Sequence, residues 1–102
     1  MHGHIERELT ARSEALARLV GAGIALARRD RRLAERLLRV AAEELEAIEM
    51  RLYAAAARRR LGQLRGGEQG RGMIVQEDVW MTGQGIKNPA RLTAMLVPGF
   101  PD

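Results

Sequence analysis

Residues 83–92 read Gly-Gln-Gly-Ile-Lys-Asn-Pro-Ala-Arg-Leu, and this stretch predicts that one helix ends and another begins with very little chain between them. Gly83 and Gly85 can take the left-handed conformation that closes a helix. Asn88 can cap the next helix through its side chain, and Pro89 suits the first helical position. The end of the chain is therefore expected to be a short docked helix and not a frayed tail.

The residues after this stretch predict how the chain finishes. Pro98, Gly99 and Pro101 forbid further helix, so the short helix is expected over residues 89–97. Its apolar side chains, with those of the tail, must pack back on an earlier part of the chain or on a partner. These side chains are Leu92, Met95, Leu96, Val97 and Phe100.

Composition restricts the class of protein. The chain has 102 residues and no cysteine, which predicts one small domain over residues 1–102 without disulfides or thiolate metal sites. Aromatic residues make up only 3% while alanine, leucine and arginine dominate, which favours helix over strand. The N-terminus lacks the apolar core of a signal peptide, and no apolar run approaches the roughly 20 residues of a membrane span. We expect a soluble all-α protein of the cytoplasm.

The first half of the chain has a helical pattern over residues 5–29. Its apolar residues recur at three- and four-residue steps and mark one helix face. They are Ile5, Leu9, Leu16, Leu19, Val20, Ile24 and Ala27. Gly21 and Gly23 within this helix indicate close approach of a neighbouring helix. Residues 28–32 are the expected turn, with Asp30 capping the helix that follows.

Residues 31–64 continue the helical period and form either one long helix or two helices with a tight break within 46–50. The glycines of residues 65–72 predict a loop, and a further helix is expected over residues 71–83. The pattern predicts antiparallel helical hairpins that turn near Asp30 and near Gly67, closed by a short C-terminal capping helix. The separation of the turns is slightly longer than the roughly 34-residue period of tetratricopeptide repeats, so the arrangement is expected to be tetratricopeptide-like.

Several segments of the second half form a distinctive set. They are MRLYAAAARRRLG at 50–62, GGEQG at 66–70, Trp80-Met81, QGI at 84–86, NPARL at 88–92 and PGF at 98–100. This set resembles the extreme C-terminus of large bacterial multidomain proteins, typically from myxobacteria, and the resemblance covers about residues 33–100. In that family an N-terminal serine/threonine protein kinase is followed by a nucleotide-binding ATPase region and tetratricopeptide-like helices.

The catalytic parts of that family have no counterpart in this sequence. No Gly-Lys-Ser/Thr triplet of a phosphate-binding P-loop occurs in the chain. The resemblance therefore implies a helical scaffold or oligomerisation segment, with no kinase or ATPase activity carried over. Two hairpins fall below the three or so repeats that usually stabilise a solenoid, which favours self-association or docking onto a partner.

No motif in the sequence indicates catalysis or a cofactor. Ser13 has no partner base that the pattern can place. His2 and His4 lie near the terminus without a third fixed ligand, so no metal site is predicted. Residues 66–72 are rich in glycine but lack the preceding strand and the spacing of a phosphate loop. We expect a protein that is not an enzyme and needs no cofactor.

Arginine accounts for almost all of the net charge of +4, in two clusters at residues 28–32 and 58–60. Such clusters can neutralise phosphates, so a small basic nucleic-acid-binding helical protein is the alternative function. Acidic residues are interleaved with the arginines, and no aromatic set is available for base stacking. Both clusters are more typical of solvated helix faces.

The preferred function is a helical protein–protein interaction or oligomerisation module, a scaffold or regulatory protein that binds itself or a protein partner. Tyr53, Trp80 and Met81 are interpreted first as core residues, although an exposed Trp80 would anchor an interface. The candidate interaction residues are Tyr53, Trp80, Met81, Leu92, Met95, Leu96 and Phe100.

Overall fold

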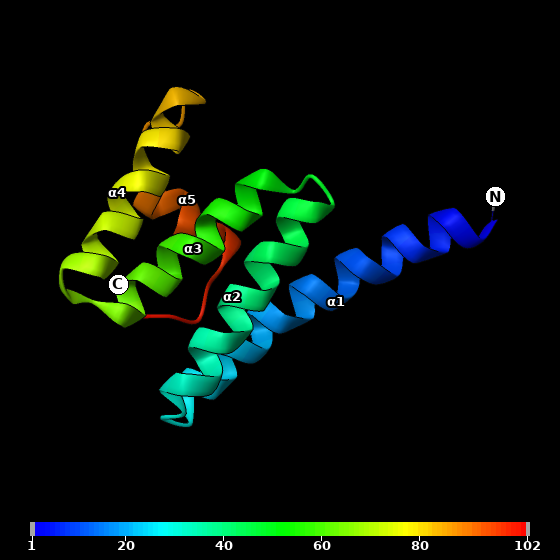
Figure 1. Ribbon diagram of the computed structural model, residues 1–102, viewed down its shortest axis with the longest axis horizontal. Helices are drawn as coiled ribbons and strands as arrows, with labels where there is room; N and C mark the ends of the chain where they lie inside the picture. Colours follow the sequence, from blue (N-terminus) through cyan, green and yellow to red (C-terminus); the bar gives the residue numbers. More distant parts are fainter. Residues whose placement is uncertain (1, 102) are drawn as a thin grey trace.

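The computed structural model describes residues 2–101, with side chains from residue 3 onwards. These residues form five helices and no strand, so the all-α prediction is confirmed (Figure 1). The helices are α1 (His2–Ala27), α2 (Arg31–Ala47), α3 (Arg51–Arg65), α4 (Gly67–Gly83) and α5 (Pro89–Leu96). The molecule measures 46 × 35 × 20 Å, and successive helices pack as hairpins.

The turn between α1 and α2 lies where the sequence predicts it. Arg29 takes a left-handed φ of 62°, and the amide of Asp30 donates to the carbonyl of Ala25 at 2.8 Å, which closes α1. The Asp30 side chain then accepts from the amide of Leu33 at 3.1 Å and caps α2. The helix expected to run to residue 29 therefore ends two residues earlier, at Ala27.

A second turn of the same kind divides residues 31–64 into two helices. Glu49 takes a left-handed φ of 61°, and the amide of Met50 donates to the carbonyl of Leu45 at 2.8 Å. Met50 is the N-cap residue of α3, and its side chain makes no capping hydrogen bond. No glycine lies in this turn, so helical periodicity alone could not exclude one long helix over residues 31–64.

The turn between α3 and α4 is shorter than the sequence indicates. Only Gly66 separates the two helices, and α4 begins at Gly67, so the loop expected over residues 65–72 is wrong. Gly70 is buried because α3 and α4 cross there in close contact. A Cβ on Gly62 would lie 2.8 Å from the Gly70 carbonyl oxygen, and a Cβ on Gly70 would lie closer still to that of Gly62. These glycines serve helix packing and not loop flexibility.

The core is built mainly from alanine around α3, which lies between α2 and α4 with α5 against it (Figure 1). Residues 54–57 of α3 are four consecutive alanines, and all are fully buried. A helix that is covered on every side at this level needs small side chains, because larger ones would hold its neighbours away. Larger residues fill the spaces between the helices, chiefly Leu19, Leu38, Leu45, Leu61, Met81, Val97 and Phe100.

The stretch 83–92 behaves largely as its residues predict. Gly85 has a φ of 88°, and the amide of Ile86 donates to the carbonyl of Met81 at 3.1 Å. The Asn88 side chain accepts from the amide of Arg91 at 3.0 Å, with Pro89 in the first turn of α5. Gly83 is instead the last residue of α4, without a left-handed φ.

The tail after α5 folds back across α3 and reaches α1. Val97 and Phe100 are buried, and a Cβ on Gly23 of α1 would lie 3.6 Å from the Gly99 carbonyl oxygen. A Cβ on Gly21 would lie 3.5 Å from the Leu37 side chain of α2. Both distances are ordinary van der Waals contacts, so neither position requires glycine, and the close approach of a helix expected at Gly21 and Gly23 is not found.

Candidate interaction surface

α1 is longer than the helix that covers it. It has 26 residues against 17 in α2, and its N-terminal part extends beyond the body of the molecule (Figure 1). Residues 3–10 are all exposed. We call residues 2–10 of α1 the projecting end; among the described residues, only the end of α2 and the turn after it approach this segment, at a cleft that Glu8 shares with Ala47, Ile48 and Glu49.

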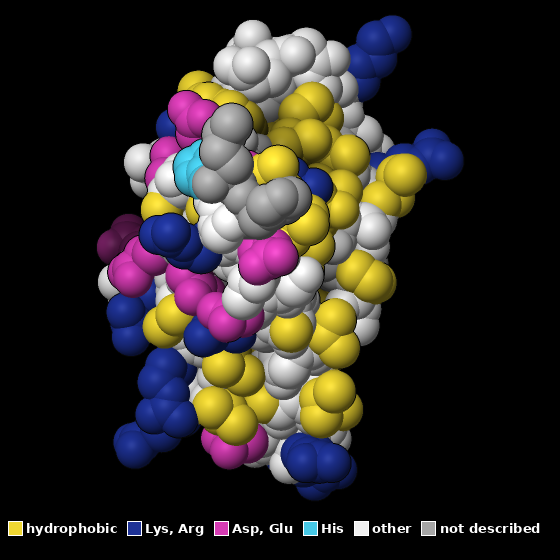
Figure 2. Space-filling view, turned by 90° about the vertical axis from the view of Figure 1, so that its right-hand side faces the viewer, with side chains coloured by type: hydrophobic (Ala, Val, Ile, Leu, Met, Phe, Trp, Pro, Cys, Tyr) yellow, Lys and Arg dark blue, Asp and Glu magenta, His cyan; other side chains and the backbone are white. Residues whose placement is uncertain are grey.

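The projecting end carries apolar side chains that belong to a longer row. We call this row the α1 stripe, and its exposed members show between 49 and 64% of their surface. The α1 stripe consists of Ile5, Leu9, Leu16, Val20 and Ile24. Figure 2 faces the N-terminal end of α1 and shows hydrophobic side chains gathered to the right of it and below it, with charged side chains mostly on the left. Arg12 and Ser13 are exposed between Leu9 and Leu16, but a row of this length is still unusual on a surface that only meets water.

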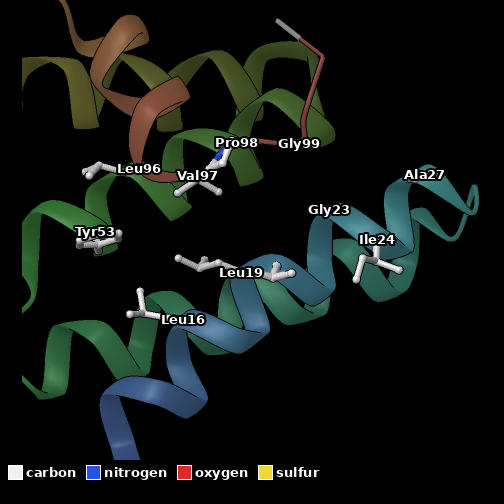
Figure 3. Close-up of a pocket in the computed structure, with 11 residues that line it drawn as sticks. Leu16, Leu19, Gly23, Ile24, Ala27, Tyr53, Leu96, Val97, Pro98 and Gly99 are labelled. Carbon is white, nitrogen blue, oxygen red and sulfur yellow. The ribbon is translucent and has the colours of Figure 1, made fainter. Parts of the chain in front are cut away.

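The C-terminal half of the α1 stripe borders a groove of about 630 Å³ that we call the α1–tail groove. α1 forms one wall, residues 96–99 form the other, and Tyr53 of α3 lies at one end (Figure 3). No Asp, Glu, Lys or Arg lines it. The lining residues are Leu16, Leu19, Val20, Gly23, Ile24, Ala27, Tyr53, Leu96, Val97, Pro98 and Gly99.

The apolar face expected for the first helix is therefore only partly a core face. α1 buries Leu19 together with three alanines, Ala15, Ala22 and Ala25, against its neighbours. The larger side chains of the α1 stripe lie on the adjacent face, since the alanine face lets α2 approach more closely. Four of the apolar residues that mark the predicted helix face, Ile5, Leu9, Val20 and Ile24, are exposed.

The structure divides the candidate interaction residues among different places. Tyr53 and Leu96 lie together in the α1–tail groove. Met81 is fully buried and Phe100 is 9% exposed, so both are core residues and offer no surface to a partner. Leu92 is half-buried and Met95 is 70% exposed on α5, away from the groove lining.

Trp80 lies in a second, smaller cleft of about 240 Å³ between α3 and α4. The Arg51 guanidinium stacks 4.7 Å from the centre of its ring, which leaves Trp80 half-buried. Glu77 lies in the same cleft, and burial raises the pKa of its carboxyl, against the opposing effect of the positive charges of Arg58 and Arg51. This cleft is lined by charged groups and differs in chemistry from the apolar α1–tail groove.

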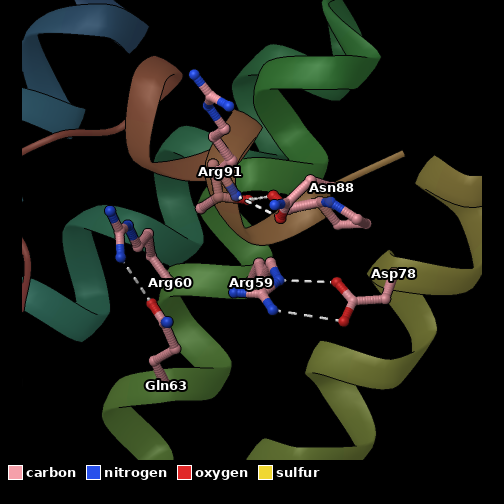
Figure 4. A network of polar contacts seen from close by, with 8 residues as sticks. Arg59, Arg60, Gln63, Asp78, Asn88 and Arg91 are labelled. Atoms are coloured by element: carbon pink, nitrogen blue, oxygen red, sulfur yellow. Dashed lines mark hydrogen bonds and ion pairs between the residues drawn. The ribbon is translucent and has the colours of Figure 1, made fainter. Parts of the chain in front are cut away.

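The arginines of residues 58–60 are engaged within the molecule. Arg59 of α3 bonds both carboxyl oxygens of Asp78 on α4, at 2.7 and 3.4 Å (Figure 4). Arg58 pairs with Glu46 at 2.9 Å. Arg60 is 1% exposed and belongs to the packing between α3 and the tail. This cluster therefore fixes α3 against its neighbours and does not form a basic face.

The arginines of residues 28–32 have different surroundings. Arg28, Arg29, Arg31 and Arg32 are all exposed at the turn between α1 and α2. The only ion pair recorded for them in the described chain joins Arg31 to Glu35 at 3.8 Å. This basic turn directly follows Ala27, which lines the C-terminal end of the α1–tail groove.

Neither a metal site nor a membrane-spanning helix is found in the described part of the chain. No group of three or more His, Cys, Asp or Glu side chains with metal-binding geometry occurs among the described residues. His4 lies 3.0 Å from Glu8 one turn along α1, whereas the His2 side chain is outside the described residues. None of the described helices is long and apolar enough to cross a membrane.

Comparisons with known proteins identify no relative of this chain. No protein-family model matches the chain, and no curated protein or solved structure is significantly similar to it. The resemblance to the C-terminal segment of bacterial kinase and ATPase proteins stays a prediction. The α1 stripe and the α1–tail groove are therefore the features from which a function can be inferred.

Proposed function

We propose that this chain is a non-enzymatic helical protein–protein interaction module whose contact surface is the α1 stripe with the α1–tail groove. The observation that carries the proposal is their alignment on one side of α1. Exposed apolar side chains of the projecting end and the α1 wall of the charge-free groove share this side, with the exposed Arg12 and Ser13 between Leu9 and Leu16. An amphipathic helix in a hydrophobic groove is a common form of peptide and protein recognition.

A tetratricopeptide-like arrangement is part of this proposal. The hairpin of α1 and α2 and the hairpin of α3 and α4 follow each other in the chain, and α2 and α4 have 17 residues each. Helical repeats of this size use their grooves to bind partners, and arrays with few repeats gain stability by association. The resemblance to C-terminal helical segments of multidomain proteins supports a scaffold or regulatory role in the same way.

The proposal is tested with a charge placed in the contact surface. Val20→Glu puts a carboxylate into the α1 stripe, and Val79→Glu makes the same change at an equally exposed valine of α4, at 64 and 67% exposure. We expect Val20→Glu to weaken association with self or with a captured partner at least about tenfold, while Val79→Glu leaves it unchanged. A wild-type chain that stays monomeric and captures no partner in a Val20-dependent manner would reject the function.

Weak nucleic-acid binding is the second candidate, favoured by the exposed arginines of residues 28–32. Phosphate neutralisation would make the affinity fall steeply with salt. Titration with duplex and single-stranded DNA at low and at physiological salt tests it, with Arg28→Ala and Arg32→Ala combined as the variant. An affinity that is absent or independent of salt would reject this function.

A further inference from the structure

We infer that the α1 stripe and the α1–tail groove are occupied by α1 of a second copy of this chain, running antiparallel to the first. The projecting end of each chain then lies in the groove of the other. This inference rests on the proposed function, because it names the partner of the same surface.

The positions along α1 have the symmetry that such a pair requires. Ile5 and Ile24 lie at equal distances along the chain from the midpoint between residues 14 and 15, and so do Leu9 and Val20. At 100° per residue these four side chains fall within about 100° of arc around the helix. A two-fold interface brings the same patch of both chains together, so residue i meets j and j meets i. Antiparallel pairing about this midpoint places Ile5 against Ile24 and Leu9 against Val20 of the other copy.

One half of α1 is an uncovered apolar segment, and the other half borders an unfilled apolar groove. The projecting end has exposed apolar side chains, whereas the half from residue 16 onward borders a groove that no described residue fills. The midpoint near residue 14 separates the two halves. One antiparallel partner therefore supplies a wall for the first half and an occupant for the second.

The charges favour the antiparallel direction. Glu6 and Glu8 are exposed on the projecting end with Arg7 between them, and the arginines of residues 28–32 are exposed at the opposite end of α1. Antiparallel pairing brings the two glutamates of each chain toward the basic turn of the other. Parallel pairing would set the two arginine-rich turns side by side, where like charges repel.

The area available matches a small, reversible interface. The 26 residues of α1 span about 39 Å, and a helix is about 10 Å across. Covering a third to a half of this cylinder removes roughly 400–600 Å² per chain from water. With both chains counted and residues 96–99 added, the total of about 900–1,300 Å² lies at the lower end of stable protein interfaces. We expect a dimer whose population depends on protein concentration.

Cysteine cross-linking in the otherwise cysteine-free chain tests both the partner and the direction. Leu9→Cys and Val20→Cys each place one cysteine at an exposed position of α1. The two positions are eleven residues and about 16 Å apart along the helix, too far for a disulfide between chains that pair in parallel. The two single variants are mixed and treated with an oxidant or a short bismaleimide. We expect covalent dimers containing one chain of each variant, and few from either variant alone. Arg7→Cys mixed with Val20→Cys is the control, because Arg7 lies on the other side of the projecting end.

Each outcome decides the question. Covalent dimers from each single variant alone would mean parallel pairing and would overturn the antiparallel inference. A wild-type chain that sediments as a monomer over the full concentration range, with no cross-link in the mixture, would overturn the second-copy inference altogether. The proposed function fails separately, only when Val20-dependent capture of other proteins is absent as well. Circular dichroism of each variant checks that the helices remain intact.

Discussion

The Nε atom of Arg60 donates a hydrogen bond to the carbonyl oxygen of Val97 at 3.0 Å, in a setting where both side chains are almost completely buried. The same guanidinium lies 5.3 Å from the centre of the Phe100 ring, and its Nη1 donates to Gln63 at 3.0 Å (Figure 4). One arginine of α3 therefore holds the tail at two points. Because the tail forms one wall of the α1–tail groove, Arg60 also fixes the shape of that groove.

Arg60→Met is expected to lower the free energy of unfolding by about 2–3 kcal/mol, since it leaves the buried Val97 carbonyl without its charged donor. The Val97 amide, which donates to Thr93 at 2.8 Å, should exchange its hydrogen faster as the tail loosens. Urea unfolding and hydrogen exchange measure the two effects. Arg36→Met, at an exposed position of α2, should change stability by no more than about 0.5 kcal/mol. Equal effects of both variants would contradict the role given to Arg60.

The contact between Gly62 and Gly70 predicts opposite effects for two glycines of α4. Gly70→Ala places a methyl group against the α3 backbone and should cost about 1–3 kcal/mol of stability. Gly72→Ala meets no atom within 4 Å and should stabilise α4 by up to about 1 kcal/mol, because alanine is the better helix former. Thermal unfolding followed by circular dichroism compares the two. Stabilisation by both variants would show that the helices do not cross so closely.

These glycines illustrate what sequence reasoning missed. Residues 65–72 contain so many glycines that local propensity predicts a loop, yet the contact with α3 makes most of that segment helical. A usable signal was present, because Gly62 and Gly70 lie four residues on either side of Gly66. In a tight hairpin that turns at Gly66, such positions face each other.

Helix caps and helix ends, in contrast, could be predicted well. Asp30 and Asn88 are side-chain caps, Pro89 opens α5, and Gly85 closes α4, because each effect depends on a few neighbouring atoms. The candidate site could be predicted less well. Periodicity identified the apolar residues of α1 but not which of them would be covered, since alanine and leucine faces compete for the same neighbour and packing distance decides the outcome.

Glu49 occupies a left-handed conformation that costs a side chain about 1–2 kcal/mol. Glu49→Gly removes this strain but adds about 0.5–1 kcal/mol of unfolded-state entropy cost. We therefore expect a net gain in stability of about 0.5–1 kcal/mol, measured by urea unfolding. Glu43→Gly, in the exposed interior of α2, should instead lose about 1 kcal/mol. Destabilisation by Glu49→Gly would mean that its side chain has a compensating role.

The raised pKa of Glu77 predicts a pH dependence of stability. Its folded-state pKa lies above the ordinary value of a glutamate, so between these two values the folded chain binds more protons than the unfolded chain. The contribution of Glu77 to the free energy of unfolding therefore falls as pH rises through that window. Glu77→Gln should remove this fall and be more stable than the wild type above it.

Urea unfolding monitored by the single tryptophan, Trp80, across a pH series measures this difference. Glu43→Gln, at an exposed position of α2, serves as the control and should leave the wild-type profile in place. If Glu77→Gln and the wild type have parallel profiles through the acidic range, the Glu77 carboxyl is not held in a desolvated setting.

Removing residues 88–102 tests whether α5 and the tail act as a cap. The truncation takes Val97 and Phe100 out of the core, removes the Val97 carbonyl that accepts from Arg60, and opens one wall of the α1–tail groove. We expect a lower melting temperature, binding of a hydrophobic dye and aggregation, because exposed core surface associates without specificity. Removing residues 2–9 from the other end should leave the melting temperature unchanged at low protein concentration, since residues 3–10 are exposed throughout. A soluble, fully helical truncation at residue 87 with an unchanged oligomeric state and melting temperature would show that α5 and the tail cover nothing essential to the fold.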